Sequence, residues 1–355
     1  MTPLYPKQIT NALKDVRYPG NGKTLEENEM IRDIRIEGDN VSLSIYFDKP
    51  TDPFAASVVR SAEATLRRAL GPDVKVTVAE KHPEASSKVE EKPLRHVKYK
   101  IAVSSGKGGV GKSTVAANLA VALASQGFKV GLLDADIFGP SVPKMFGVED
   151  EGLYMINRDG RDWIDPIEKY GVKLLSIGFV VDKEKAVVWR GTMASNALRQ
   201  LITDAWWGDL DFFLIDLPPG TSDIHLTTIQ TLDLDGAVIV TTPQEVALAD
   251  ARKGIEMFTN DKINIPVLGV VENMSWFTPL PHPDERYYIF GEGGGKKLAE
   301  DFNVPLLAQI PLVAEIRERA DSGHPVLAIE ETAPEGVNPA ADAFRDLGIK
   351  LLSVI

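Results

Sequence analysis

From residue 99 onward, short runs of nearly uninterrupted apolar residues alternate with longer stretches in which apolar side chains recur every three or four positions. The short runs are typical of strands buried on both faces, and the longer stretches are typical of amphipathic helices. This alternation predicts an α/β fold whose mostly parallel sheet is covered by helices on both faces. The predicted strands are Ile101–Ser104, Val130–Leu133, Lys173–Ile177, Phe212–Leu217, Ala237–Thr241 and Val267–Val271.

The first part of the chain has a different pattern. A helical stretch is followed by two runs of alternating apolar and polar residues around the turn Gly38–Asn40, then by a second helical stretch and the short run Val74–Val78. This helix-strand-strand-helix-strand order predicts a small α+β domain over residues 1–80. Residues 81–97 are polar and charged and predict a flexible linker. The larger α/β domain then covers residues 98–355.

The loop after the first strand of the larger domain fits a phosphate-binding pattern. It follows G-x-x-x-x-G-K-S/T, in which glycines let backbone N–H groups converge on phosphate oxygens. In this pattern Lys112 neutralises the β- and γ-phosphates, and the Ser113 hydroxyl binds Mg²⁺. A helical pattern follows the loop, so a helix N-terminus faces the anion. The residues expected to hold a nucleoside triphosphate are Gly106, Lys107, Gly108, Gly109, Val110, Gly111, Lys112, Ser113 and Thr114.

Acidic residues stand at the carboxyl ends of two predicted strands, where parallel sheets place ligands. Asp134 and Asp136 follow the second strand, and Asp216 lies at the end of the fourth. An aspartate at the end of a buried apolar strand is costly unless something pairs it. We interpret Asp216 as the residue that, with Ser113, holds Mg²⁺. For Asp134 and Asp136, capping of a helix or turn stays open as an alternative to catalysis.

Composition narrows the range of partners. The chain has 355 residues, a formal net charge of −12 and a pI of about 5.0, so we expect no nucleic-acid partner. No apolar run reaches the ~18 residues of a membrane-spanning helix, and the first residues lack the apolar core of a signal peptide. We therefore expect a cytoplasmic protein without a membrane partner. The absence of cysteine excludes disulfides, thiolate catalysis and cysteine-ligated metal clusters.

A second lysine in the loop, Lys107, follows the first glycine directly. This form resembles the deviant phosphate loop of the superfamily of the nitrogenase iron protein, MinD and ParA. The resemblance implies ATP and a homodimer in which Lys107 reaches the partner's phosphates; a solvated loop lysine is the alternative. It also implies that Asp136 positions the attacking water, which makes Lys107, Lys112 and Asp136 the catalytic residues. It further implies that Asn273 hydrogen-bonds the adenine, beside a base pocket lined by Pro311.

Further motifs narrow the resemblance to one family. They are Trp189-Arg190-Gly191, Asp216–Thr221, Thr241–Gln244, Glu272–Ser275 and Ile289–Gly291. In this order they resemble the Mrp/ApbC family of iron–sulfur cluster carrier ATPases, and residues 1–80 resemble a small domain of iron–sulfur assembly factors. The resemblance implies a slow, Mg²⁺-dependent P-loop ATPase that binds a cluster transiently and delivers it to apoproteins, with iron–sulfur assembly proteins as partners. Thr192 and Ser222 depart from the family's proline and glycine.

One departure concerns the cargo. Many relatives carry a C-P-x-C pair soon after the segment that corresponds to Glu272–Met274, whereas this chain has Thr278–Arg286 without cysteine. A rigid proline-rich turn is one interpretation, and metal binding by His282 with Asp284 or Glu285 is the other. Two further functions stay open. One is a nucleotide-switched positioning or partitioning ATPase of the MinD/ParA kind, and the other is a regulatory scaffold that binds ATP with little turnover.

Overall fold

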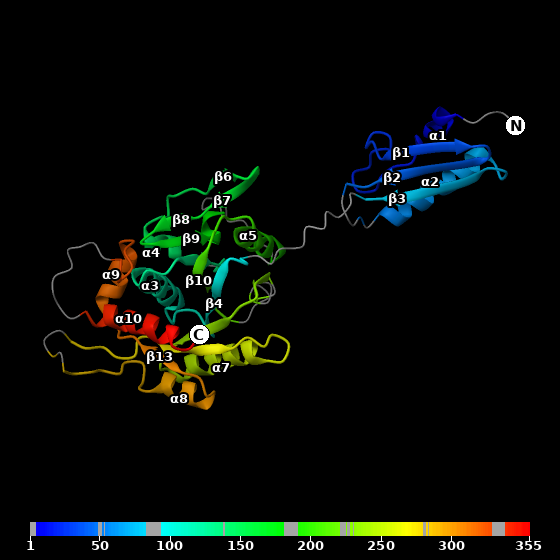
Figure 1. Ribbon diagram of the computed structural model, residues 1–355. Helices are drawn as coiled ribbons and strands as arrows, with labels where there is room; N and C mark the ends of the chain where they lie inside the picture. The colour runs from blue at the N-terminus through cyan, green and yellow to red at the C-terminus, as the bar shows by residue number, and fades with distance from the viewer. Residues whose placement is uncertain are drawn as a thin grey trace. The chain divides into compact units, whose positions relative to one another are not determined.

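The chain separates into two compact units, Met1–Glu91 and Lys92–Ile355 (Figure 1). The computed structural model describes residues 5–48, 52, 54–82, 94–137, 139–180, 191–220, 225, 228–229, 231–279, 282, 284–328 and 338–355. Most of the expected linker lies outside these residues, as do Trp189, Arg190, Thr221 and Ser222 of the family motifs. None of the helices within the described ranges is long and apolar enough to cross a bilayer.

The first unit is a three-stranded sheet with two helices packed on it. The elements are α1 (Pro6–Leu13), β1 (Ile31–Glu37), β2 (Asn40–Tyr46), α2 (Ala55–Leu70) and β3 (Lys75–Lys81). β2 lies in the middle, antiparallel to β1 and parallel to β3. Leu13 of α1, Leu66 of α2 and Ile45 of β2 are fully buried in one core. The α+β order predicted from the alternating pattern is confirmed.

The second unit is built on an eight-stranded sheet in the order β13-β12-β11-β4-β10-β5-β9-β8. All neighbouring pairs are parallel except β8 with β9. The strands are β4 (Val97–Ser105), β5 (Val130–Asp134), β8 (Ile167–Lys169), β9 (Val172–Ser176), β10 (Leu210–Asp216), β11 (Gly236–Thr241), β12 (Val267–Glu272) and β13 (Leu306–Gln309). The mostly parallel sheet expected from the sequence is confirmed, and all six predicted strands are present.

Helices cover both faces of this sheet (Figure 1). The core on one face includes α3 (Lys112–Ser125), α4 (Val142–Phe146) and α10 (Pro339–Leu352). The core on the other face includes α5 (Gly191–Thr203), α7 (Glu245–Thr259) and α8 (Gly294–Asp301). A further helix, α9 (Ala314–Asp321), contacts α4.

A separate hairpin, β6 (Tyr154–Arg158) and β7 (Arg161–Asp165), precedes the antiparallel edge strand β8.

The register of the central strands determines which residues meet at the carboxyl edge of the sheet. Asp216 at the end of β10 lies beside Asp134 of β5 and beside Val103 of β4, just before the glycine-rich loop. The acids and the loop therefore meet at the same edge of the sheet, as expected for a parallel α/β protein.

Candidate nucleotide site

The glycine-rich loop connects β4 directly to the first residue of α3, Lys112. Two of its glycines are required by backbone conformation, because Gly109 and Gly111 have φ angles of 84° and 83°. A third, Gly106, is required by packing, since a Cβ there would lie 2.1 Å from the carbonyl carbon of Asp250 in α7. The loop is thus packed closely against α7 and leads directly into the N-terminus of α3, where unpaired N–H groups favour an anion.

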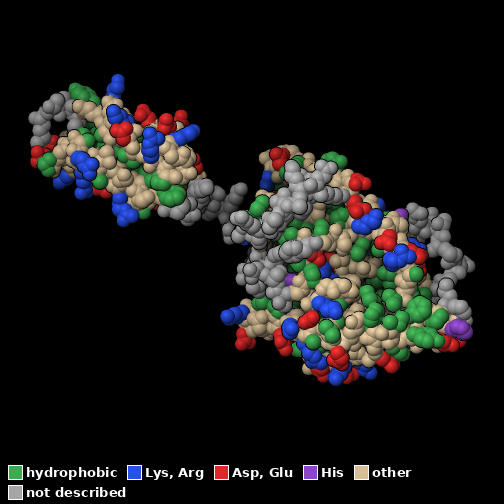
Figure 2. Space-filling model, turned by 180° about the vertical axis from the view of Figure 1, so that it is seen from behind, with side chains coloured by type: hydrophobic (Ala, Val, Ile, Leu, Met, Phe, Trp, Pro, Cys, Tyr) green, Lys and Arg blue, Asp and Glu red, His purple; other side chains and the backbone are tan. Residues whose placement is uncertain are grey.

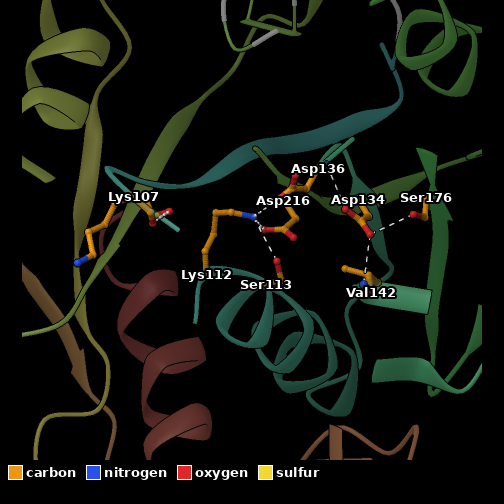
Figure 3. A network of polar contacts seen from close by, with 9 residues as sticks. Lys107, Lys112, Ser113, Asp134, Asp136, Val142, Ser176 and Asp216 are labelled. Carbon is orange, nitrogen blue, oxygen red and sulfur yellow. Dashed lines mark hydrogen bonds and ion pairs between the residues drawn. The ribbon is translucent and has the colours of Figure 1, made fainter. Parts of the chain in front are cut away.

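Lys112 is the centre of the site (Figure 3). Its Nζ lies 2.5 Å from Oδ1 of Asp216, 3.2 Å from Oγ of Ser113 and 3.9 Å from Oδ2 of Asp136. Only 6% of the lysine side chain is exposed. The fold therefore brings together four residues singled out in the sequence, contributed by α3, by the end of β10 and by the turn after β5.

Asp216 is fully buried, and burial raises the pKa of its carboxyl, while the neighbouring Lys112 ammonium acts in the opposite direction. Its Oδ1 is held by Lys112, but Oδ2 has no hydrogen-bond partner in the described part of the chain. An oxygen lone pair is thus available beside the Ser113 hydroxyl. These are the ligand types that Mg²⁺ prefers, so this donor set fits the cation.

Asp134 differs from Asp136 in its surroundings. Its carboxylate is fully buried and accepts hydrogen bonds from Asp136 N at 3.1 Å, Val142 N at 3.2 Å and Ser176 Oγ at 3.0 Å (Figure 3). Burial, and then the charge of Asp216, raise the pKa of Asp134 to about 7. Asp134 therefore acts as a cap: its hydrogen bonds connect the turn at Asp136 to the start of α4 and to β9.

Lys107 lies on the other side of the loop. Its side chain points away from the cluster around Lys112 (Figure 3), and its carbonyl oxygen accepts a hydrogen bond from Ser105 Oγ at 2.9 Å. The structure therefore does not bring Lys107 to the phosphate side of its own loop. Its ammonium group points away from Lys112 and the acids around it (Figure 3).

Asn273 and Pro311 lie on neighbouring segments after β12 and β13. Asn273 is 6% exposed, and its Nδ2 donates a hydrogen bond to the carbonyl oxygen of Val110 at 2.9 Å. The two segments are joined by Ile310 N, which donates to Glu272 O at 2.8 Å, and Pro311 itself is buried. Asn273 therefore touches the loop directly, and Pro311 is placed one strand further along.

Glu272, which the sequence analysis names only as part of a family motif, has a supporting role that the sequence did not reveal. Its buried carboxylate accepts hydrogen bonds from Gly295 N at 2.5 Å and from Gln309 Nε2 at 2.8 Å. These contacts fasten the end of β12 to the start of α8 and to β13. An acid that closes a buried apolar strand was the available signal, the same one that led to Asp216.

The segment Trp276–Ile289 includes Thr278–Arg286, of which Leu280, Pro281 and Pro283 lie outside the described residues. Phe277 and Tyr287 pair across it as an antiparallel bridge, and Arg286 stacks on Trp276 at 4.2 Å. Figure 2 shows apolar side chains gathered here, at the lower right of the larger unit, where Phe277, Tyr287 and Ile289 are 38%, 50% and 60% exposed. Of the expected metal set, His282 Nδ1 lies 3.6 Å from Glu285 Oε1, and the described residues contain no cluster of three or more metal-ligating side chains.

Comparison with known proteins decides the family. The family model described as NUBPL iron-transfer P-loop NTPase matches residues 96–348. The chain belongs to this family. A second model, described as iron–sulfur cluster assembly protein, matches residues 6–78. This chain is 42% identical over 334 residues to the iron–sulfur cluster carrier protein of Synechocystis sp., covering 94% of this chain and 93% of the relative. The family expected from the sequence motifs is thus confirmed.

Other relatives agree. The iron–sulfur cluster carrier protein of Pseudomonas fragi is 54% identical over 241 residues, covering 68% of this chain and 82% of the relative. Among solved structures, a nucleotide-binding protein of Archaeoglobus fulgidus in complex with ADP is 38% identical with a TM-score of 0.57, covering 70% of this chain and 96% of that one. The cell division ATPase MinD of Pyrococcus furiosus is 26% identical with a TM-score of 0.51, covering 73% and 100%. This chain thus has the P-loop NTPase fold.

Proposed function

We propose that this protein is a slow, Mg²⁺-dependent ATP hydrolase that works as a homodimer and helps to deliver iron–sulfur clusters to apoproteins. The observation that carries the proposal is the position of Lys112 at the start of α3, with Asp216 and Asp136 both within 4.0 Å of its Nζ. A buried lysine between two acids at a helix N-terminus provides a phosphate ligand and the groups that act on it.

In this mechanism the loop amides from Gly106 to Thr114 and the Lys112 ammonium bind the phosphates of ATP. Because Lys112 now contacts Asp216, binding requires its Nζ to turn from that carboxylate to the phosphate oxygens. Asp136 orients the attacking water, and Lys112 neutralises the charge that develops on the γ-phosphate. Ser113 and Asp216 would hold Mg²⁺, which would supply charge neutralisation at the phosphates. Asn273 and Pro311 bind the adenine.

The direction of Lys107 supports a dimer. A lysine that points away from its own site does not contact the nucleotide bound by its own chain. If a second copy faces this loop, the lysine can reach the phosphates of the nucleotide bound by that copy. We assign Lys107 to the partner's nucleotide. Each hydrolytic site is then complete only when two chains meet, which couples hydrolysis to the association of the two copies.

The cargo is the iron–sulfur cluster itself. Thiolates are the usual ligands of such clusters, and this chain has no cysteine. We propose that the cluster is bound only transiently and that its ligands come from a small thiol, an iron–sulfur assembly protein or the apoprotein that receives it. The domain of residues 1–80 is assigned to docking with those proteins, since residues 6–78 match an iron–sulfur assembly family.

A positioning ATPase of the MinD/ParA kind is the alternative, supported by the likeness to the archaeal MinD. A membrane-binding member of that class needs an amphipathic tail. Here the apolar residues of α10, among them Phe344 and Leu347, are fully buried in the same core as α3. Because the apolar face of α10 is buried in the protein's own core, it is not available to bind a membrane, which favours the carrier function.

The test is anaerobic cluster transfer. The full-length protein, MgATP and a thiol-ligated cluster are mixed with an apo-ferredoxin, and holo-ferredoxin is followed by visible absorption. We expect faster transfer with ATP than with a non-hydrolysable analogue. Equal transfer rates with ATP, with the analogue and with no protein would contradict the carrier function. ATP hydrolysis measured in the same mixture would still support the proposed ATPase activity.

A further inference from the structure

The side-chain amide of Asn273 makes a contact that base binding does not require. Its Nδ2 lies 2.9 Å from the carbonyl oxygen of Val110, inside the phosphate loop. A carbonyl oxygen can only accept, so the amide must present its nitrogen to the loop. The contact is buried, since Asn273 is 6% exposed and Val110 is 2% exposed. A buried donor–acceptor pair of this kind is costly to break on one side.

The next residue of the loop is packed against the same amide. Gly111 has a φ angle of 83°, and a Cβ built on it would lie 2.2 Å from Nδ2 of Asn273. The amide therefore fills the space that a side chain at this position would need. The Asn273 side chain thus hydrogen-bonds Val110 and packs against Gly111, immediately before the first turn of α3.

Asn273 itself is anchored from behind. Its backbone N–H donates to Thr241 O at 2.8 Å at the end of β11. The preceding residue, Glu272, is fastened to Gly295 and Gln309 through its carboxylate. The backbone that carries the amide is therefore anchored to β11, β13 and α8, so we interpret the contact as one that holds the loop.

We propose that Asn273 is a positioning residue of the phosphate loop. It holds the Val110–Gly111 turn in the shape that directs its N–H groups at the phosphates, before any nucleotide binds, and so lowers the ordering cost of binding. This inference deepens the proposed ATP site and rests on it. One amide hydrogen is used by Val110, which leaves the second hydrogen and Oδ1 for the base. The same side chain then links base recognition to the shape of the loop.

A ligand without a base separates the two roles. The affinities of full-length parent, Asn273→Ala and Asn273→Asp for Mg²⁺-tripolyphosphate and for MgATP would be measured by calorimetry at pH 8. We expect both ligands to bind about five- to tenfold more weakly to Asn273→Ala, the size of one lost hydrogen bond. Asn273→Asp keeps the shape but faces Val110 with an acceptor, so the loss should be at least as large. If both variants bound tripolyphosphate as tightly as the parent, Asn273 could act only through the base, and the proposal would be overturned.

Hydrogen exchange tests the loop without any ligand. Amides of a peptide covering residues 106–114 should exchange faster in Asn273→Ala than in the parent. The control is Asn338→Ala, which removes the asparagine that caps α10 through Ala340 N and Ala341 N. It should lower stability without changing exchange in the loop, whereas equal exchange in Asn273→Ala and parent would contradict the inference. Failure of the parent to bind MgATP would instead count against the proposed ATP site.

Discussion

Nζ of Lys112 lies 2.5 Å from Oδ1 of Asp216, with 6% of the lysine side chain and none of the aspartate side chain exposed. In water such a pair contributes little, but in the interior each partner depends on the other, because an unpaired buried charge is strongly disfavoured. The contact has two consequences. The Lys112 ammonium compensates the charge of the Asp216 carboxylate, and this contact must be exchanged for phosphate contacts when ATP enters.

The first prediction concerns stability and catalysis together. Lys112→Ala should abolish hydrolysis and lower the unfolding free energy of the nucleotide-free protein by about 3–5 kcal/mol at pH 8. Because burial already raises the pKa of Asp216, the acid can become neutral as the pH falls, so the loss should shrink toward pH 5. Urea unfolding at both pH values measures this.

The matched control for that experiment is Lys100→Ala. Lys100 Nζ lies 3.3 Å from Asp235 Oδ2, but the aspartate side chain is 42% exposed. Its removal should cost at most about 1 kcal/mol at either pH. A Lys112→Ala variant as stable as Lys100→Ala would show that the buried pair contributes nothing to folding.

The second prediction separates binding from turnover. Asp136→Ala should bind MgATP with parental affinity but hydrolyse it at least about 100-fold more slowly, because the attacking water loses its base or its orientation. Phosphate release and ATP binding are measured on the same sample. Asp162→Ala, at an exposed position of strand β7, serves as the control and should behave as the parent. Parental turnover by Asp136→Ala would assign the role to another residue.

The third prediction tests Lys107 across the dimer. Lys107→Ala should bind ATP through its own Lys112 and loop amides yet fail to hydrolyse it. Mixing it with Lys112→Ala should restore activity, because in one of the two sites of a heterodimer both lysines are present. Light scattering or cross-linking establishes that heterodimers form. Heterodimers no more active than either variant alone would place Lys107 outside the partner's site.

The fourth prediction follows from Asp134. Its folded-state pKa of about 7 lies above the ordinary value of 3.8, so the native protein retains a proton that the unfolded chain has released. Stability from this group is therefore full below about pH 4 and is lost as the pH rises toward 7. Asp134→Asn should flatten the fall in unfolding free energy over that range. The same slope in parent and variant would mean that Asp134 is ionised throughout.

The fifth prediction concerns the cluster. Anaerobic reconstitution of the protein with iron and sulfide should give visible absorption only while excess thiol is present, since the chain has no thiolate of its own. Metal analysis after thiol removal should find little iron. A stoichiometric cluster that survives this step would direct attention to His282 and Glu285.

The sequence predicted the central strands well because strands buried on both faces are nearly continuous apolar runs. The hairpin β6–β7 escaped prediction, since its strands are mostly exposed, as at Tyr154 and Met155, and carry no such run. Phosphate-loop residues were found because their spacing is local. Glu272 was missed because its partners, Gly295 and Gln309, lie 23 and 37 residues away and only the fold brings them together.

The position of α10 in the sequence, after all the strands of the sheet, affects how the protein folds during its synthesis. Phe344 and Leu347 complete the core on the outer side of α3, the helix that begins at Lys112. The ribosome makes α3 early and α10 after every strand of the sheet. While the chain is being synthesised, the helix that carries the phosphate loop therefore has an uncovered apolar face. Until α10 has emerged, the core on this side of α3 lacks Phe344 and Leu347, so we expect ribosome-bound intermediates of this protein to be clients for chaperones.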